Sequence, residues 1–260
     1  MADRLLSALV VVLTSMRAEA RDSLRRPLVI VNAAVQPVVY LLITTKVAPS
    51  GPAKVSGLVS AVVLMTMWSC TVWMAGGVLR RERTSGTLAR AMCSTRPAYL
   101  VLLGKSLGAT LLSLVTVLVT ITVTVLALGQ PTAFRSPGVL ILALAITMLS
   151  GTALGMIVSC LFLLTRHGLI WSSALTYPVY ILAGLLIPRS QLPLALRWIP
   201  DLISLQWIHN FVSASSAGEP VLGPVLIACG LTAGYFALAV WSINHVVTTA
   251  RRKGSLDLSW

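Results

Sequence analysis

Charged side chains are scarce in this chain, because Asp, Glu, Lys and Arg make up only 10% of its 260 residues. A soluble domain carries roughly 25%. Hydrophobic residues make up 57% of the chain, and its mean hydropathy is +0.89. Too little polar surface is present to cover a particle in water, so the composition excludes an ordinary soluble globule.

Acidic residues are the scarcest charged type, with 7 Asp and Glu against 20 Lys and Arg, and the formal net charge is +13. The long apolar runs contain no acidic residue. A proton-coupled carrier normally needs a carboxylate inside the membrane, so a single-chain secondary transporter is disfavoured. The basic residues flank the apolar runs, which indicates membrane lipid headgroups as partners and no nucleic acid.

Motifs for catalysis, metal binding and nucleotide binding are missing. Gly104-Lys105-Ser106 ends like a phosphate-binding loop, but Tyr99 stands where GxxxxGK[ST] needs its first glycine. We therefore expect no catalytic residue, cofactor or metal in this chain. The cysteines lack metal-site spacing and are predicted to be plain thiols: Cys70, Cys93, Cys160 and Cys229.

Six apolar runs are each long enough to cross the roughly 30 Å hydrocarbon core of a bilayer as a helix. Strands of a membrane barrel would instead alternate over about 10 residues. The predicted fold is therefore an all-α membrane protein, a single transmembrane domain over 1–260. Its predicted spans are residues 28–47, 57–79, 99–128, 138–164, 169–187 and 221–247.

Basic residues concentrate on one side of the predicted bundle. That side holds the arginines of residues 1–26, those of the loop 80–97 and the C-terminal Arg251, Arg252 and Lys253. By the positive-inside rule it is cytoplasmic, so both termini are expected inside. An even number of spans is then required, and six fits.

Three segments outside the spans have distinctive sequences. In residues 1–26, a basic row at a spacing of four (Arg17, Arg21, Arg25) beside an apolar face predicts an amphipathic helix at the membrane surface. The loop 80–97 is dense in charge. The external segment 188–220 is too apolar for a free loop and too broken by proline for a span. Short helices at the outer leaflet, or dipping into it, are expected there.

Small residues share one face of the fourth predicted span. Gly151, Gly155 and Ser159 follow one another at a spacing of four. Such a face lets two helices approach closely. Packing within one subunit is the favoured interpretation, and a lining role is the alternative.

The loop after the second predicted span has a distinctive order of residues. It runs through Glu82, Arg83, Gly86, Thr87, Leu88, Pro97, Gly104 and Lys105. This order resembles the membrane subunits of type-2 ABC transporters, the bacterial drug and polysaccharide exporter permeases. That family often has Glu where this chain has Ala89. A second similar block before the last span contains Gly184, Pro188, Leu192, Pro193, Pro200 and Trp207.

The resemblance implies a multi-pass permease of a bacterial cytoplasmic membrane. In this family a coupling helix, here within 80–97, docks on a separate ATPase subunit that binds ATP and Mg. Two ATPase copies and a second permease, identical or homologous, are the implied partners. The alternative is a solvated basic loop. The implied coupling residues are Glu82, Arg83, Gly86, Thr87 and Leu88.

Soft and aromatic side chains suit an amphipathic drug, antibiotic or lipid as the exported substrate. A polysaccharide or glycolipid permease is one alternative, and a membrane enzyme or non-transporting assembly factor is another. Ordinary packing is at least as good an explanation for each residue of the substrate path and gate named next. The predicted substrate path is Met67, Trp68, Cys70, Met74, Tyr177 and Tyr180, and the predicted external gate is Pro188, Leu192 and Pro193.

Overall fold

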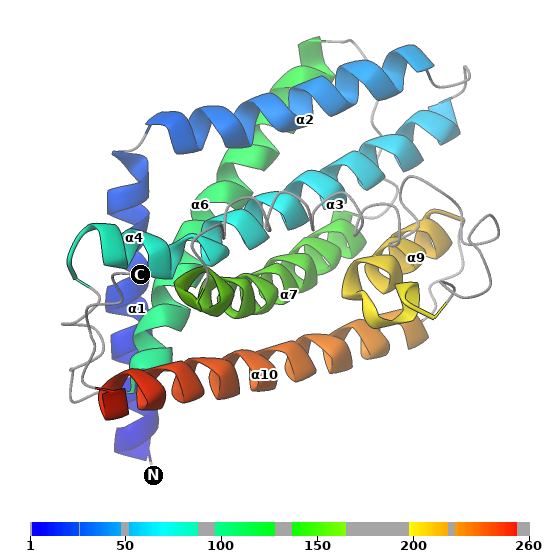
Figure 1. Ribbon diagram of the computed structural model, residues 1–260. Coiled ribbons are helices and arrows are strands. Elements are labelled where there is room, and N and C mark those ends of the chain that lie inside the picture. The colour runs from blue at the N-terminus through cyan, green and yellow to red at the C-terminus, as the bar shows by residue number, and fades with distance from the viewer. Residues whose placement is uncertain are drawn as a thin grey trace.

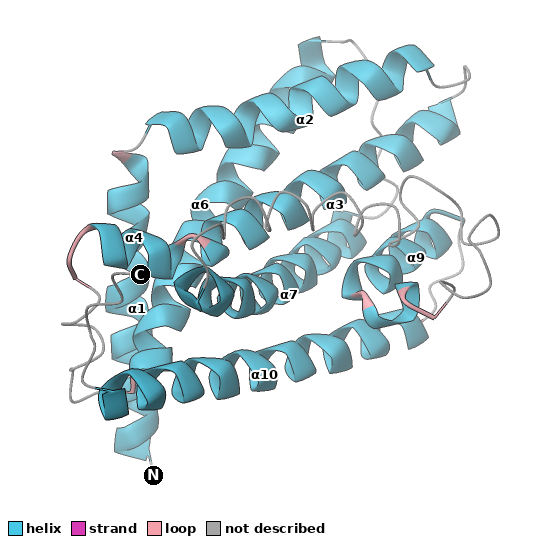
Figure 2. Ribbon diagram, viewed as in Figure 1, coloured by secondary structure: helices cyan, strands magenta, loops and turns pink. Residues whose placement is uncertain are grey.

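The structure is a computed structural model. It describes residues 2–25, 27–47, 52–87, 97–127, 137–164, 198–217 and 222–253. In these ranges the regular elements are helices, which Figure 2 draws in cyan with a few short loops and turns in pink. The all-α class is therefore confirmed for this part of the chain.

The helices follow the predicted apolar runs closely. The helices α2, α6 and α7 begin and end within one residue of the predicted spans, and α10 continues past residue 247. The predicted span 169–187 lies outside the described residues. In chain order the elements are α1 (Ala2–Leu24), α2 (Pro27–Val47), α3 (Pro52–Gly76), α4 (Val78–Thr84), α6 (Ala98–Ala127), α7 (Pro137–Leu164), the 3-10 turn η3 (Pro200–Leu202), α9 (Ser204–Ala217) and α10 (Gly223–Lys253).

Four stretches of the described chain are long and apolar enough to cross a membrane. The first of them runs through both α3 and α4, and α2 contributes a shorter apolar stretch, Ala34–Ile43. The chain is thus a membrane protein, and the total of six spans stays a prediction. The four stretches are Val59–Thr84, Ala98–Thr124, Gly138–Cys160 and Gly223–Thr249.

The helix α3 lies at the centre of the bundle (Figure 1) and packs against α2, α6 and α7, while α10 packs against α7. Its side chains divide between two apolar clusters. One cluster joins Leu64 and Trp68 to α7, α9 and α10, and the other joins Met67 to α2 and α6. On the outside of α6, Val115, Val119 and Val123 form an exposed apolar row, as expected of a face that meets lipid.

Glycines bring α7 against α3 with almost no space between them. A Cβ atom added to Gly151 would collide with the Thr71 side chain, and one added to Gly155 would collide with the Cβ of Ala75. The predicted close approach along this face of α7 is therefore confirmed. It packs two helices of the same chain against each other, which is the favoured interpretation of the pattern.

The helix α1 crosses the bundle transversely, beside α6 (Figure 1). The backbones of α1 and α6 meet at two glycines one turn apart. A Cβ atom on Gly104 would lie 2.5 Å from the Val12 carbonyl oxygen, and one on Gly108 would strike the carbonyl oxygen of Met16. These glycines fix how closely α1 can lie on the rest of the molecule.

The described part of segment 188–220 contains η3 and α9, while its external location stays a prediction. The helix α9 buries Leu205, Ile208 and Phe211 in the cluster that it shares with α3 and α7. The indole N–H of Trp207 donates a hydrogen bond to the Asp201 carbonyl oxygen at 3.0 Å, which holds η3 against α9. The described part of this segment is thus packed on protein, while its depth in the membrane stays a prediction.

We expect Gly108→Ala to destabilise the protein by about 1–3 kcal/mol, because the new methyl group overpacks the contact with Met16. The measurement is thermal unfolding of the purified protein in detergent. Gly230→Ala is the matched control, since nothing lies within 4 Å of a Cβ added there. Equal melting temperatures for the two variants would contradict the proposed backbone contact.

Candidate functional site

Helices α3 and α4 are separated by a break at Gly77. Side chains form hydrogen bonds with the backbone groups on both sides of this break. The Leu79 N–H donates to Ser159 Oγ of α7 at 3.1 Å, and Arg81 Nη2 donates to the Met74 carbonyl oxygen at 3.0 Å. Backbone groups at a helix end need such partners. A Cβ atom on Gly77 would come within 2.6 Å of Arg81 Nη1, so glycine lets the guanidinium fold back over the break.

The break also moves a boundary expected from the sequence. The prediction ended the second span at residue 79 and began the coupling helix at residue 80. In the structure α3 ends at Gly76, and α4 runs from Val78 to Thr84 in the same apolar stretch. The glycine, and not the basic pair that follows it, interrupts the helix. Residues 88–96 of the predicted coupling helix lie outside the described residues.

Arg81 also connects α4 to the transverse helix α1. Its Nη2 lies 2.9 Å from Glu19 Oε1, and the Glu19 side chain is only 6% exposed. A carboxylate withdrawn this far from water is stable only when it is paired and hydrogen-bonded. The ion pair therefore holds α1 and α4 at a fixed position relative to each other.

Glu82 forms a second ion pair, with Lys105 of α6. Its other carboxylate oxygen, Oε2, accepts a hydrogen bond of 2.6 Å from the Thr87 hydroxyl. Both oxygens of this buried carboxylate are therefore engaged within the chain.

The helix α4 ends in a Schellman turn, a helix end closed by two backbone hydrogen bonds. The Gly86 N–H donates to the Arg83 carbonyl oxygen at 3.1 Å, and the Thr87 N–H donates to the Glu82 carbonyl oxygen at 3.0 Å. Gly86 has φ +67°, in the left-handed region that favours glycine. We call residues 77–87, the break, α4 and this turn, the elbow.

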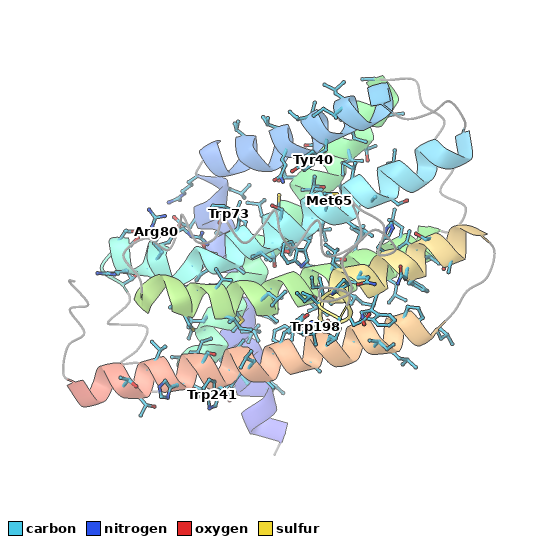
Figure 3. All side chains as sticks on the ribbon, turned by 45° about the vertical axis from the view of Figure 1, so that its right-hand side comes forward. Tyr40, Met65, Trp73, Arg80, Trp198 and Trp241 are labelled. Carbon is cyan, nitrogen blue, oxygen red and sulfur yellow. The ribbon has the colours of Figure 1, made fainter. Side chains whose placement is uncertain are left out.

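The predicted coupling residues divide between the inside and the outside of the elbow. Glu82 is buried, whereas Arg83, Gly86 and Thr87 are exposed. Leu88 lies outside the described residues. Figure 3 shows Arg80 at the same end of the bundle, where its side chain is exposed. The structure thus joins Glu82 to Thr87 and leaves an exposed turn beyond them, while the coupling role stays a prediction.

Sequence analysis missed three residues of the elbow's support: Glu19, Arg81 and Lys105. One signal was available for Glu19, because it lies on the opposite side of α1 from the row of exposed arginines. Another signal was available for Lys105, because it belongs to the Gly104-Lys105 pair that the sequence analysis had already compared with a phosphate-binding loop. Its nitrogen meets the carboxylate of Glu82 instead of a phosphate.

The sequence model of the ABC-2 type transporter family matches residues 10–216, from α1 through α9. The chain belongs to the ABC-2 type transporter family. The resemblance seen in the sequence is therefore confirmed. As an ABC-2 permease, the chain is the membrane component of a transporter, and the family implies partnership with an ABC ATPase. No curated protein matches the chain significantly.

Three predicted substrate-path residues of this ABC-2 permease are packed inside the chain. Met67, Trp68 and Cys70 are all buried in the apolar clusters around α3. Met74 is half-buried beside the Gly77 break. Packing therefore accounts for the three buried residues, and nothing shows them lining a path. The other predicted path and gate residues lie outside the described residues: Tyr177, Tyr180, Pro188, Leu192 and Pro193.

The permease also buries polar atoms on α9 that the sequence did not single out. Gln206 Oε1 and His209 Nδ1 have no hydrogen-bond partner in the described part of the chain. The two residues are three positions apart and so lie on neighbouring sides of one helix. Burial lowers the pKa of His209 and so favours the neutral form of its ring. A buried polar atom without a partner requires an explanation.

We expect Lys105→Met to destabilise the permease by about 3 kcal/mol, because it leaves the buried Glu82 carboxylate without its cation. Glu82→Gln should cost less, because the partly exposed Lys105 ammonium can still reach water. The double variant should lose less than the sum of the two single losses. Denaturant titration of the four proteins in mixed micelles measures this difference. Arg80→Gln, at an exposed position, is the control and should change stability by less than about 0.5 kcal/mol. Strictly additive losses would show that the two charges do not stabilise each other.

Proposed function

We propose that this ABC-2 permease is the membrane subunit of an ATP-driven exporter that moves an amphipathic small molecule, such as a drug, antibiotic or lipid, out of a bacterial cell. Two permeases, identical or homologous, pair with two ATPase subunits that bind ATP and Mg. Each permease has six spans in the cytoplasmic membrane. The elbow and both termini are on the cytoplasmic side, where most basic residues lie.

The braced elbow is the observation that supports this proposal. Arg81 connects it to α1, Lys105 connects it to α6, and Ser159 connects it to α7. A push on the exposed turn at Gly86 therefore reaches three helices through short, charged or hydrogen-bonded contacts. An ATPase that changes shape needs such a stiff element, since a mobile loop would absorb the movement.

The rival substrates are a polysaccharide or a glycolipid, which the same family implies equally. The tight packing of Met67 and Trp68 gives no support to a wide aromatic-lined channel within one chain. A membrane enzyme is the rival from another class. We favour export because the elbow has the form of a force-transmitting contact.

The decisive experiment expresses the permease with an ABC ATPase of the same genome and purifies the complex. We expect a stable complex whose ATP hydrolysis is stimulated by amphipathic compounds and which carries them across liposome membranes. Transport by the permease alone would contradict the proposal. Failure of the two proteins to associate would contradict it as well.

We expect Gly86→Val to uncouple ATP hydrolysis from transport, because a β-branched residue is strongly disfavoured at φ +67° and would reshape the turn. Gly86→Asn is the matched control, since asparagine tolerates the left-handed region. The measurement is transported substrate per ATP hydrolysed in proteoliposomes. Equal coupling ratios in the two variants would show that the shape of this turn does not matter.

We assign Gln206 on α9 as a polar contact for the transported molecule, because its buried Oε1 has no partner in the described chain. Gln206→Leu should then raise the melting temperature, since it removes an unsatisfied polar group from an apolar cluster. The same change should raise the substrate concentration needed to stimulate the ATPase about tenfold. A purely structural glutamine would give a lower melting temperature and an unchanged concentration.

A further inference from the structure

The helix α1 has three faces with different surroundings. Glu19 and Ser23 are buried on the face that turns toward the bundle. A second face carries large apolar side chains that remain exposed, at 67% for Leu6 and 59% for Leu9, with Leu13 beside them. An exposed apolar face on a helix that lies transverse to the bundle has the form of an interfacial membrane helix.

The third face of α1 is basic. Arg17, Arg21 and Arg25 follow one another at a spacing of four, and all three are exposed. The last of them lies just past the end of the helix at Leu24. Asp22 is the acidic residue nearest to this row in the sequence, while Glu19 is turned inward and paired with Arg81. The exposed row is thus predominantly positive.

An apolar face beside a basic face matches one partner, a membrane that contains anionic lipid. The leucines enter the boundary of the acyl chains, and the arginines then lie at the depth of the phosphates. We infer that α1 binds anionic phospholipid headgroups through Arg17, Arg21 and Arg25. We infer further that bound lipid steadies the elbow through Glu19 and Arg81, and this second part rests on the proposed function.

Few contacts separate the basic row of α1 from the elbow. Arg17 and Arg21 flank Glu19 in the sequence, and Glu19 Oε1 lies 2.9 Å from Arg81 Nη2. The Gly104 and Gly108 contacts hold the same region of α1 against α6, so α1 cannot move without disturbing the ion pair. Lipid that fixes α1 in the interface therefore also fixes the position of α4.

Lipid binding is tested on the full-length permease alone, in detergent, by following its melting temperature as phosphatidylglycerol or phosphatidylcholine is added. We expect phosphatidylglycerol to raise the melting temperature, because a ligand that binds only the folded state stabilises it. Changing Arg17, Arg21 and Arg25 together to Gln should raise the phosphatidylglycerol concentration needed roughly 100-fold. Changing them to Lys should restore the response to within a few fold, since the charge is kept.

The matched control removes three charges elsewhere, by changing Arg251, Arg252 and Lys253 at the end of α10 to Gln. It should respond to phosphatidylglycerol like the unaltered protein. Three results would overturn the inference: an equal loss in this control, an equal response to phosphatidylcholine, or the same stabilisation by inorganic phosphate alone. The last would identify a free anion site in place of a lipid surface.

Regulation is tested on the permease–ATPase complex in nanodiscs with and without phosphatidylglycerol. We expect ATP hydrolysis to rise several-fold with the anionic lipid, and Glu19→Gln to abolish this rise while lipid binding persists. Arg81→Lys is a second variant, which keeps the charge but cannot reach both Glu19 and the Met74 carbonyl oxygen. An undiminished rise in both variants would overturn the regulatory part. If no ATPase complex forms, the proposed function fails, while the lipid-binding result still stands.

Discussion

Two buried carboxylates that must be neutralised organise one end of this molecule. A charge withdrawn from water is costly unless a cation and further hydrogen bonds meet it, so each of these carboxylates requires a basic partner at short range. Glu19 of α1 meets Arg81 of α4, and Glu82 of α4 meets Lys105 of α6. Because the partners belong to different helices, neutralising the charges also sets the positions of these helices. The chain has only 7 acidic residues, and two of them form ion pairs at this end of the bundle.

The ion pairs require the small residues around them. Gly77 leaves space for the Arg81 guanidinium over the break, and Gly104 and Gly108 let α1 lie directly on α6. A larger residue at any of these positions would hold α1 or the guanidinium farther from the carboxylates. The motif that looks like the end of a phosphate-binding loop is therefore explained without a phosphate: Gly104 makes the backbone contact, and Lys105 neutralises Glu82.

The sequence predicted the helices well because membrane thickness dictates the length of an apolar run, and α2, α6 and α7 match their predicted bounds within one residue. It also predicted the close approach at Gly151 and Gly155, since small residues at a spacing of four form a face on any helix. The ion pairs of the elbow could not be predicted from the sequence. Glu19 and Arg81 are 62 residues apart, and a local sequence pattern does not show which distant charges pair. Nor does the pattern distinguish the glycine that interrupts a helix, Gly77, from one that packs. For Met67, Trp68 and Cys70 the sequence alone does not separate a core position from a path position. The structure shows all three buried inside the chain, and their role in a path stays a prediction.

The inward pairing of the acids has a consequence for the outer side of the elbow. With Glu82 engaged inside, the exposed positions of α4 include Arg80 and Arg83, and its acidic charge does not face outward. A protein that docks on this surface therefore meets a positive turn that is braced from within by carboxylates. Under the proposed function, the docking groove of the ATPase should present acidic side chains, and its association with the elbow should weaken as salt screens the exposed charges. The buried pairs are screened much less, so the elbow should keep its shape under conditions that release its partner.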